Sequence, residues 1–212
     1  PVAASDKKNL QVINKLKRKN IPIVLADRGI KDSDFDFVTT NNFEGSRQIT
    51  QHLINRGHRK IAFLSNKLYS TERLRYDGFI SKMKELKIAQ DPSITILDKS
   101  AFNVNRYLNH AHKILKNRKK FTAVYAGHDR IALLFYAAAK NLGLNVPEDF
   151  SLVGYDNMPL TTVALTTMHQ PIYEMGEESI KLIVSRIKKE SNNTKNIILK
   201  SNLIDRTSVN SI

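Results

Sequence analysis

The chain has 212 residues, and 34 Lys and Arg against 20 Asp and Glu give a formal net charge of +14. With 41% hydrophobic and 25% charged residues it has the composition of a globular protein, which argues against disorder, and no apolar run approaches the ~20 residues that cross a bilayer. The absence of cysteine excludes disulfides, thiolate zinc sites and a cysteine nucleophile.

Turn and periodicity signals predict a regular alternation of helices and strands. In chain order we expect a helix over 5–20, strands over 23–26 and 35–39, a helix over 44–56, a strand over 60–64, a helix over 71–86, a strand over 94–97, a helix over 104–116, a strand over 121–125, a helix over 129–142, a strand over 151–155, a helix over 173–189 and an extended segment over 197–204. Most strands are continuous apolar runs, which is typical of a parallel sheet covered on both faces. The sequence therefore predicts an α/β, doubly wound architecture.

The basic residues are spread over several of these helices, mostly in or just after the last turn, where they offset the negative end of the helix dipole. No basic run is interleaved with aromatic residues, and no zinc-finger spacing occurs. The charge therefore favours a solvated surface that steers anions over direct, specific nucleic-acid binding. The lack of cysteine suits the cytoplasm, and the Lys-rich, amphipathic first 20 residues do not form a secretory signal.

Motifs for catalysis are missing from the sequence. There is no phosphate-binding Gly-Lys-Ser/Thr loop, no G-x-G-x-x-G after a strand and no G-x-S-x-G elbow. His110 and His112 stand two apart on a predicted helix and are poorly placed to share a metal ion. We expect no enzyme, no cofactor and no metal, although a Ser/His/Asp set assembled only in space stays open.

Polar residues follow nearly every predicted strand. In doubly wound sheets, ligands bind beyond the carboxyl ends of the strands, so these residues are the candidates for a binding site. They are rich in Asp, Asn, Gln and Arg, with aromatic residues nearby, a chemistry that suits a neutral polyhydroxylated ligand. The positions are 27–28, 41–42, 66–71, 99–102, 127–129, 155–157 and Gln170.

Each candidate also has a structural interpretation. Asp129 suits a helix cap, and Arg75 suits a surface ion pair with Glu72 one turn earlier. Phe102 suits ordinary core packing and His128 a hydrogen-bonded structural histidine. For Asp156 we favour the functional role, because a carboxylate that ends a buried strand needs partners.

Several segments, in order along nearly the whole chain, resemble a known family. The most specific are GHRKIAFL over 57–64 and VPEDFSLVGYD over 146–156, with IPIVLADR over 21–28, RLRYDGF over 73–79 and TAVYAGHDRIA over 122–132. Together they resemble the effector-binding domain of the LacI/GalR family of bacterial transcription regulators.

The resemblance implies a fold like the type I periplasmic binding proteins, with two Rossmann-like lobes of doubly wound parallel sheet and the effector in the cleft. The N-terminal lobe would comprise 1–40 and 171–198 and be incomplete. The C-terminal lobe would comprise 41–170 and 199–212. The family's helix-turn-helix DNA-binding domain would be absent from this chain, as after truncation.

Carried over by position, the resemblance implies seven ligand-binding residues, with Arg75 and Asp156 the strongest. The sequence departs from the family pattern at two positions. His128 stands where the family commonly has Asn, and Asn41 stands where it commonly has Asp. The seven residues are Asp27, Asn42, Arg75, Phe102, His128, Asp156 and Gln170.

The implied function is the effector-sensing domain of a bacterial repressor. A sugar or sugar derivative would close the cleft and change the geometry of a cytoplasmic homodimer. Operator DNA would be contacted only through the missing N-terminal domain, and no membrane would be involved. The alternative is a sugar-binding protein of a transport or chemoreception system, which has the same fold. The third class is a doubly wound enzyme, which would need a nucleophile or cofactor motif that this sequence does not show.

Overall fold

The computed structural model describes residues 7–28, 35–159, 163–190 and 193–212. The chain forms two compact units, which we treat separately. Unit 1 comprises Pro1–Asn41, Tyr69–Thr71 and Pro171–Lys200, and unit 2 comprises Asn42–Leu68, Glu72–Gln170 and Ser201–Ile212. The sequence also predicted that the chain divides into two lobes that bind a ligand, with boundaries near residues 40, 170 and 198. That division stays a prediction.

Unit 1 is built on a three-stranded parallel sheet with the order β1-β2-β8, formed by Val24–Ala26, Asp36–Thr40 and Asn196–Leu199. Helix α6 (Ile172–Ile187) packs against β1 and β2, and helix α1 spans Lys7–Arg18. Its small core joins the strand residue Val38 to Met175 and Leu182 of α6. The strand expected over 23–26 is only partly buried, contrary to the buried strand that its apolar run predicted.

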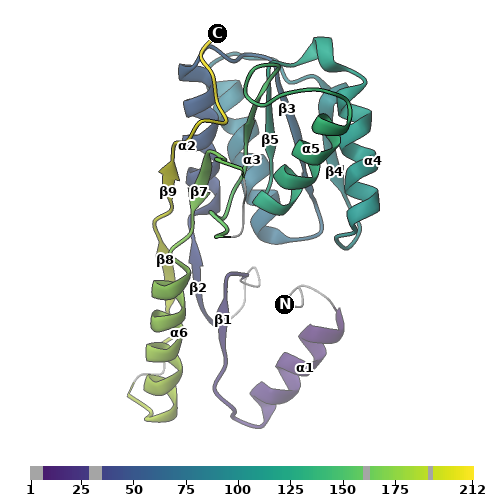
Figure 1. Ribbon diagram of the computed structural model, residues 1–212. Helices are drawn as coiled ribbons and strands as arrows, with labels where there is room; N and C mark the ends of the chain where they lie inside the picture. Colours follow the sequence, from purple (N-terminus) through teal and green to yellow (C-terminus); the bar gives the residue numbers. More distant parts are fainter. Residues whose placement is uncertain (1–6, 29–34, 160–162, 191–192) are drawn as a thin grey trace. The chain divides into compact units, whose positions relative to one another are not determined.

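Unit 2 contains a four-stranded parallel sheet with the order β4-β3-β5-β6, seen in the upper part of Figure 1. Its strands are β3 (Ile61–Asn66), β4 (Thr95–Asp98), β5 (Ala123–Ala126) and β6 (Ser151–Val153). Its helices are α2 (Asn42–Asn55), α3 (Ser70–Glu85), α4 (Val104–Leu115) and α5 (Asp129–Asn141), with short 3-10 helices at Pro92–Ile94 and Arg118–Lys120. Parallel pairing and flanking helices confirm the α/β class expected from the sequence.

Helices cover both faces of this sheet. Neighbouring side chains of a strand point to opposite faces, so one strand contributes to two cores. From β3, Leu64 packs into a core with α4 and α5, whereas Phe63 packs into a core with α2 and α3. Ile49 and Leu53 of α2 are buried, and Gly57, just after the helix, has a left-handed conformation. On the helix expected over 71–86, Phe79 and Met83 are buried, whereas Leu74 and Leu86 are exposed.

The extended segment expected over 197–204 is divided into two strands. Its first part is β8 of unit 1, and its second part, β9 (Asn202–Ile204), pairs antiparallel with β7 (Thr167–His169) in unit 2. β7 is the short strand that precedes Gln170, the last of the residues expected to follow a strand, whereas its pairing with β9 was not predicted. The predicted loop over 31–34 lies outside the described residues. In the described part of the chain, no helix has the length and apolar character of a membrane span.

Candidate functional site

Four of the predicted site residues meet at the carboxyl ends of the unit 2 strands. Asn42 is the first residue of α2, Arg75 lies on α3, Asp156 follows β6 and Gln170 follows β7. Asn42 is 1% exposed and Arg75 is 4% exposed. The interpretation of Arg75 as a surface ion pair is therefore wrong, because α3 turns this side chain toward the edge of the sheet.

The guanidinium of Arg75 is the centre of the cluster. Its Nε donates to Asn42 Oδ1 at 2.8 Å, and its Nη1 donates to the carbonyl oxygen of Gly127 at 2.8 Å. Its Nη2 lies 3.1 Å from Asp156 Oδ1, and the guanidinium carbon lies 3.8 Å from the ring centroid of Tyr155. Burial lowers the pKa of Arg75, but the charge of Asp156 together with Tyr155, Glu72 and Tyr125 outweighs it, so the net pKa is raised and Arg75 keeps its charge.

Asp156 forms the accessible edge of the cluster, because its side chain is 25% exposed. Its Oδ1 also accepts a hydrogen bond of 2.7 Å from Nε2 of Gln170. Its backbone φ is +112°, a conformation that L-residues rarely adopt. A carboxylate held by an arginine and an amide, yet open to solvent, is chemically suited to accept hydrogen bonds from a polar ligand.

Glu72 is a second buried acid close to the cluster. It accepts from the hydroxyl of Ser65 at 2.9 Å and from the backbone N–H of Asn66 at 2.8 Å. Burial raises the pKa of Glu72, and the positive charge of Arg75 opposes that rise. From its helix spacing Glu72 was expected only in a surface ion pair with Arg75, because spacing alone does not show which side of α3 is buried.

Phe102 and His128 form an aromatic pair beside the cluster, with ring centroids 5.7 Å apart. Phe102 also stacks on Tyr107 at 5.0 Å and lies under the guanidinium of Arg130 at 4.4 Å. His128 caps α5, since its Nδ1 accepts from the backbone N–H of Ile131 at 3.3 Å. The two rings join the Arg75 cluster through Gly127, the neighbour of His128 in the chain.

Asp129 does not cap α5, so the capping interpretation is wrong and His128 takes that position. The Asp129 carboxylate accepts from the backbone N–H of Met158 at 2.8 Å and from the hydroxyl of Thr167 at 2.7 Å. Burial raises the pKa of Asp129 to about 6, against the effect of these hydrogen bonds.

Asp27 lies in unit 1, at the end of β1, and is described there by itself. Its φ is +68°, and its carbonyl oxygen accepts from the hydroxyl of Thr39 at 2.7 Å. Its carboxylate lies 3.5 Å from Nε of Arg28. Its role in ligand binding stays a prediction, as do the ligand roles of the other six residues.

Positions 127 and 155 were among the residues expected to follow the strands, but the sequence did not predict that the carbonyl of Gly127 and the ring of Tyr155 contact Arg75. A backbone acceptor leaves no trace in the residue type. Tyr155 did have a signal, because it directly precedes Asp156 and ends a buried strand.

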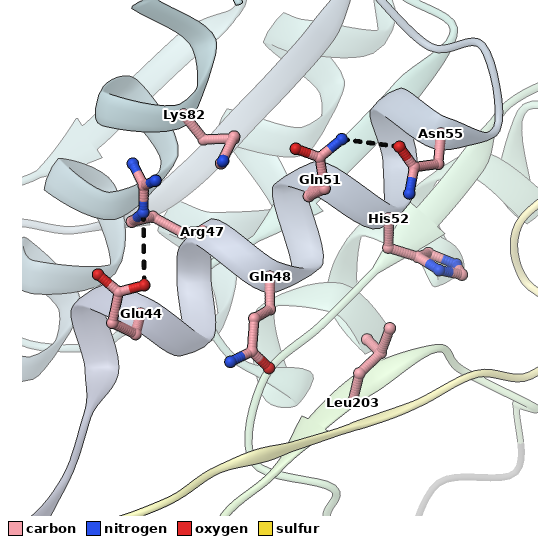
Figure 2. Close-up of a pocket in the computed structure, with 8 residues that line it drawn as sticks. All are labelled: Glu44, Arg47, Gln48, Gln51, His52, Asn55, Lys82 and Leu203. Carbon is pink, nitrogen blue, oxygen red and sulfur yellow. Dashed lines mark hydrogen bonds and ion pairs between the residues drawn. The ribbon is translucent and has the colours of Figure 1, made fainter. Parts of the chain in front are cut away.

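A polar groove of about 420 Å³ lies elsewhere on unit 2, along the outer side of α2 (Figure 2). Its charged groups pair with each other or with neighbours, as in the 3.4 Å contact between Arg47 and Glu44 and the hydrogen bond from Gln51 to Asn55. The polar side chains of these exposed pairs do not point toward one shared position in the groove. The lining residues are Glu44, Arg47, Gln48, Gln51, His52, Asn55, Lys82 and Leu203.

Comparisons with known proteins point to one kind of protein. Residues 50–209 match the sequence profile of a family described as periplasmic binding protein-like domain. The HTH-type transcriptional repressor PurR of Pectobacterium carotovorum subsp. carotovorum (strain PC1) is 35% identical over 196 residues, covering 90% of this chain and 57% of the repressor. The chain thus spans a little over half the length of such relatives.

Solved structures agree with that match. A LacI family transcriptional regulator from Enterococcus faecium with bound ribose superposes with a TM-score of 0.86 at 26% identity, covering 99% of this chain and 78% of that one. The transcriptional regulator CelR in complex with cellobiose gives a TM-score of 0.84 at 27% identity, covering 96% and 63%. The likeness confirms the predicted type I binding-protein fold. The matched proteins are regulators and not enzymes, which confirms that expectation as well.

Proposed function

Because this chain belongs to the periplasmic binding protein-like domain family, as the effector-binding domain of a LacI-family regulator, we propose that it senses a sugar or related polar molecule. The Arg75 cluster is the proposed binding site. The observation that carries this proposal is the Asp156 carboxylate, which is fixed by Arg75 and Gln170 and still partly exposed.

The chemistry of the cluster matches a neutral polyhydroxylated ligand. The carboxylate of Asp156 accepts hydrogen bonds from hydroxyls, while the guanidinium beside it neutralises its charge, so the site needs no cation from the ligand. Relatives of the same fold are solved with bound ribose and with cellobiose, which supports a sugar as the ligand class here.

The wider role follows from the relatives, which include repressors. We infer that the protein acts as a cytoplasmic homodimer and regulates transcription, with operator DNA bound by a helix-turn-helix segment encoded before residue 1. Reading the codons upstream tests this inference. A helix-turn-helix there is the expected result, whereas a secretory signal would favour a transport or chemoreception protein. Light scattering tests the dimer.

A thermal-shift screen tests the ligand class. D-ribose and cellobiose represent sugars, and adenine represents a flat heteroaromatic ligand. A ligand present at 100 times its Kd stabilises the folded state by about 2.7 kcal/mol, which corresponds to about 5–10 °C in melting temperature for a chain of this size. We expect a sugar to give such a shift. A shift with adenine alone would contradict the sugar assignment.

A further inference from the structure

The turn over 155–158 carries the key carboxylate in a conformation that needs outside support. Asp156 has a φ of +112° and Asn157 a φ of +54°. Two consecutive residues with a Cβ in this region are sterically disfavoured, and such turns persist only where their surroundings hold them. Whatever holds this turn therefore determines where the Asp156 carboxylate lies.

Asp129 holds both ends of that turn. Its backbone N–H donates to the carbonyl oxygen of Tyr155 at 2.8 Å, and its Oδ2 accepts from the backbone N–H of Met158 at 2.8 Å. The two hydrogen bonds bracket Asp156 and Asn157. The other carboxylate oxygen accepts from the hydroxyl of Thr167 at 2.7 Å, which ties β7 to the same point.

The packing around Asp129 leaves room for this carboxylate and little else. Asp129 is 1% exposed, and a Cβ added to Gly154 would lie 2.1 Å from its Oδ1. Because both oxygens are engaged by protein donors and the side chain is buried, Asp129 is not placed to touch a ligand itself. Its hydrogen bonds act on the turn that carries Asp156.

We propose that Asp129 is a positioning residue of the effector site, holding the 155–158 turn so that the Asp156 carboxylate meets Arg75 and Gln170. The part of this inference that concerns ligand binding rests on the proposed function. Its structural part, that Asp129 holds the turn, stands on the described contacts alone.

The carboxylate also makes the turn sensitive to pH. Burial raises the pKa of Asp129 to about 6, and an ionised carboxylate accepts stronger hydrogen bonds than a protonated one. Lowering the pH through 6 therefore loosens the turn. The titratable or charged groups nearest to Asp129 on the packed elements include Asp156 and Tyr155 on the turn, His128 and Arg130 at the start of α5, His169 on β7, and Arg206. Of these, His169 and Arg206 are bonded to Asn157.

The first test uses the ligand-free protein. Hydrogen exchange at the backbone amides of Asp156 and Met158 should be at least about tenfold faster in Asp129→Ala than in the native protein. Asp91→Ala is the control, since Asp91 also accepts from a backbone N–H, that of Ser93 at 2.7 Å, at an exposed site. Thr167→Val, which removes one of the donors, should give a smaller increase. Unchanged exchange in both Asp129→Ala and Thr167→Val would overturn the proposal.

The second test measures the affinity for D-ribose and for cellobiose by calorimetry. At pH 7.5, Asp129→Ala should bind about 10–100-fold more weakly, whereas Asp129→Asn should lose only about threefold. An asparagine at this position can accept from Met158 and donate to Thr167. At pH 5 the native protein and Asp129→Asn should converge, and because both keep His128 and His169, the convergence isolates Asp129.

The two tests separate the two proposals. If the native protein binds and Asp156→Asn does not, but Asp129→Ala binds normally, the positioning role is overturned while the proposed function stands. If the native protein binds neither sugar, the sugar assignment fails, and the exchange rates still decide whether Asp129 holds the turn.

Discussion

Each of the two units contains an arginine–aspartate pair, and the pairs differ in geometry. In unit 1, Arg186 contacts Asp36 through two nitrogens, with Nε to Oδ2 at 2.6 Å and Nη2 to Oδ1 at 2.8 Å. In unit 2, Arg75 meets Asp156 through one contact of 3.1 Å. Asp36 is 5% exposed, whereas the Asp156 side chain is 25% exposed.

The difference separates a structural pair from a binding site. Asp36 also accepts from the backbone N–H of Lys195 at 2.7 Å, so its carboxylate is saturated, and it links β2 to α6 and to the segment before β8. Asp156 keeps an accessible edge and a conformation that must be held in place. We therefore expect substitutions in the first pair to change stability, and those in the second to change ligand binding.

Arg75→Ala should have the largest effect, because it removes the centre of the cluster. It leaves Asp156, Asn42 and the carbonyl of Gly127 without their shared donor, and breaking a buried pair in this way costs about 3–5 kcal/mol. We expect binding to be lost and the free energy of unfolding, measured with urea, to fall by that order. Arg75→Lys is the control that keeps the charge. Native affinity in Arg75→Ala would contradict the placement of the site.

Asp156→Asn should reduce the affinity for the ligand with little change in stability. Hydrogen bonds to a charged group are worth about 1.5–3 kcal/mol each, which corresponds to about 10–100-fold in Kd. Asparagine tolerates a positive φ, so the melting temperature should stay within about 2 °C of the native value. Calorimetry and a melting curve on one preparation measure both. A large fall in melting temperature would show that this pair is as structural as the one in unit 1.

Asp36→Asn should show the opposite pattern, with lower stability and unchanged affinity. Burial raises the pKa of Asp36, but hydrogen bonds from Arg186 and Lys195 outweigh it and lower the pKa overall. A carboxyl with a lowered folded-state pKa stabilises the protein above its unfolded value of about 3.9, and this stabilisation fades as the pH falls through the folded value.

We therefore expect Asp36→Asn to melt about 2–4 °C lower than the native protein at pH 7, with the gap closing as the pH falls below the unfolded value. Melting curves between pH 3 and 7 measure the gap. A gap that grows on acidification would contradict the assignment of the Asp36–Arg186 pair as a stabilising one.

Arg47→Ala should have the smallest effect and locates the site by exclusion. Arg47 lines the groove on α2 and pairs with Glu85 at 2.5 Å, at an exposed position where such pairs contribute little. We expect the Kd to be unchanged and the melting temperature to move by about 1 °C or less. A marked loss of affinity in the same titration would move the site to the groove.

The sequence predicted the order of elements and the parallel sheets well, because apolar runs are local signals. The antiparallel β7–β9 pair was missed because it joins two three-residue strands far apart in the chain. Such pairing is set by tertiary contacts and not by local propensity.

The residue types of the site could be predicted from the sequence, but the hydrogen bonds and ion pairs that connect them could not. The family resemblance implied that Arg75 and Asp156 share a site, and only Asp156 was also indicated by its place after a strand. That Arg75 is buried, and that Asp129 holds a turn instead of capping a helix, depends on side-chain direction. A sequence pattern does not contain that information.

An NMR titration with the sugar that gives the largest thermal shift tests the central claim most directly. We expect the backbone amide signals of Asn42, Asp156 and Gln170 to move as the sugar is added, while those of Gln48 and Gln51 in the groove stay in place. Movement confined to the groove residues, with the three site amides unchanged, would contradict it.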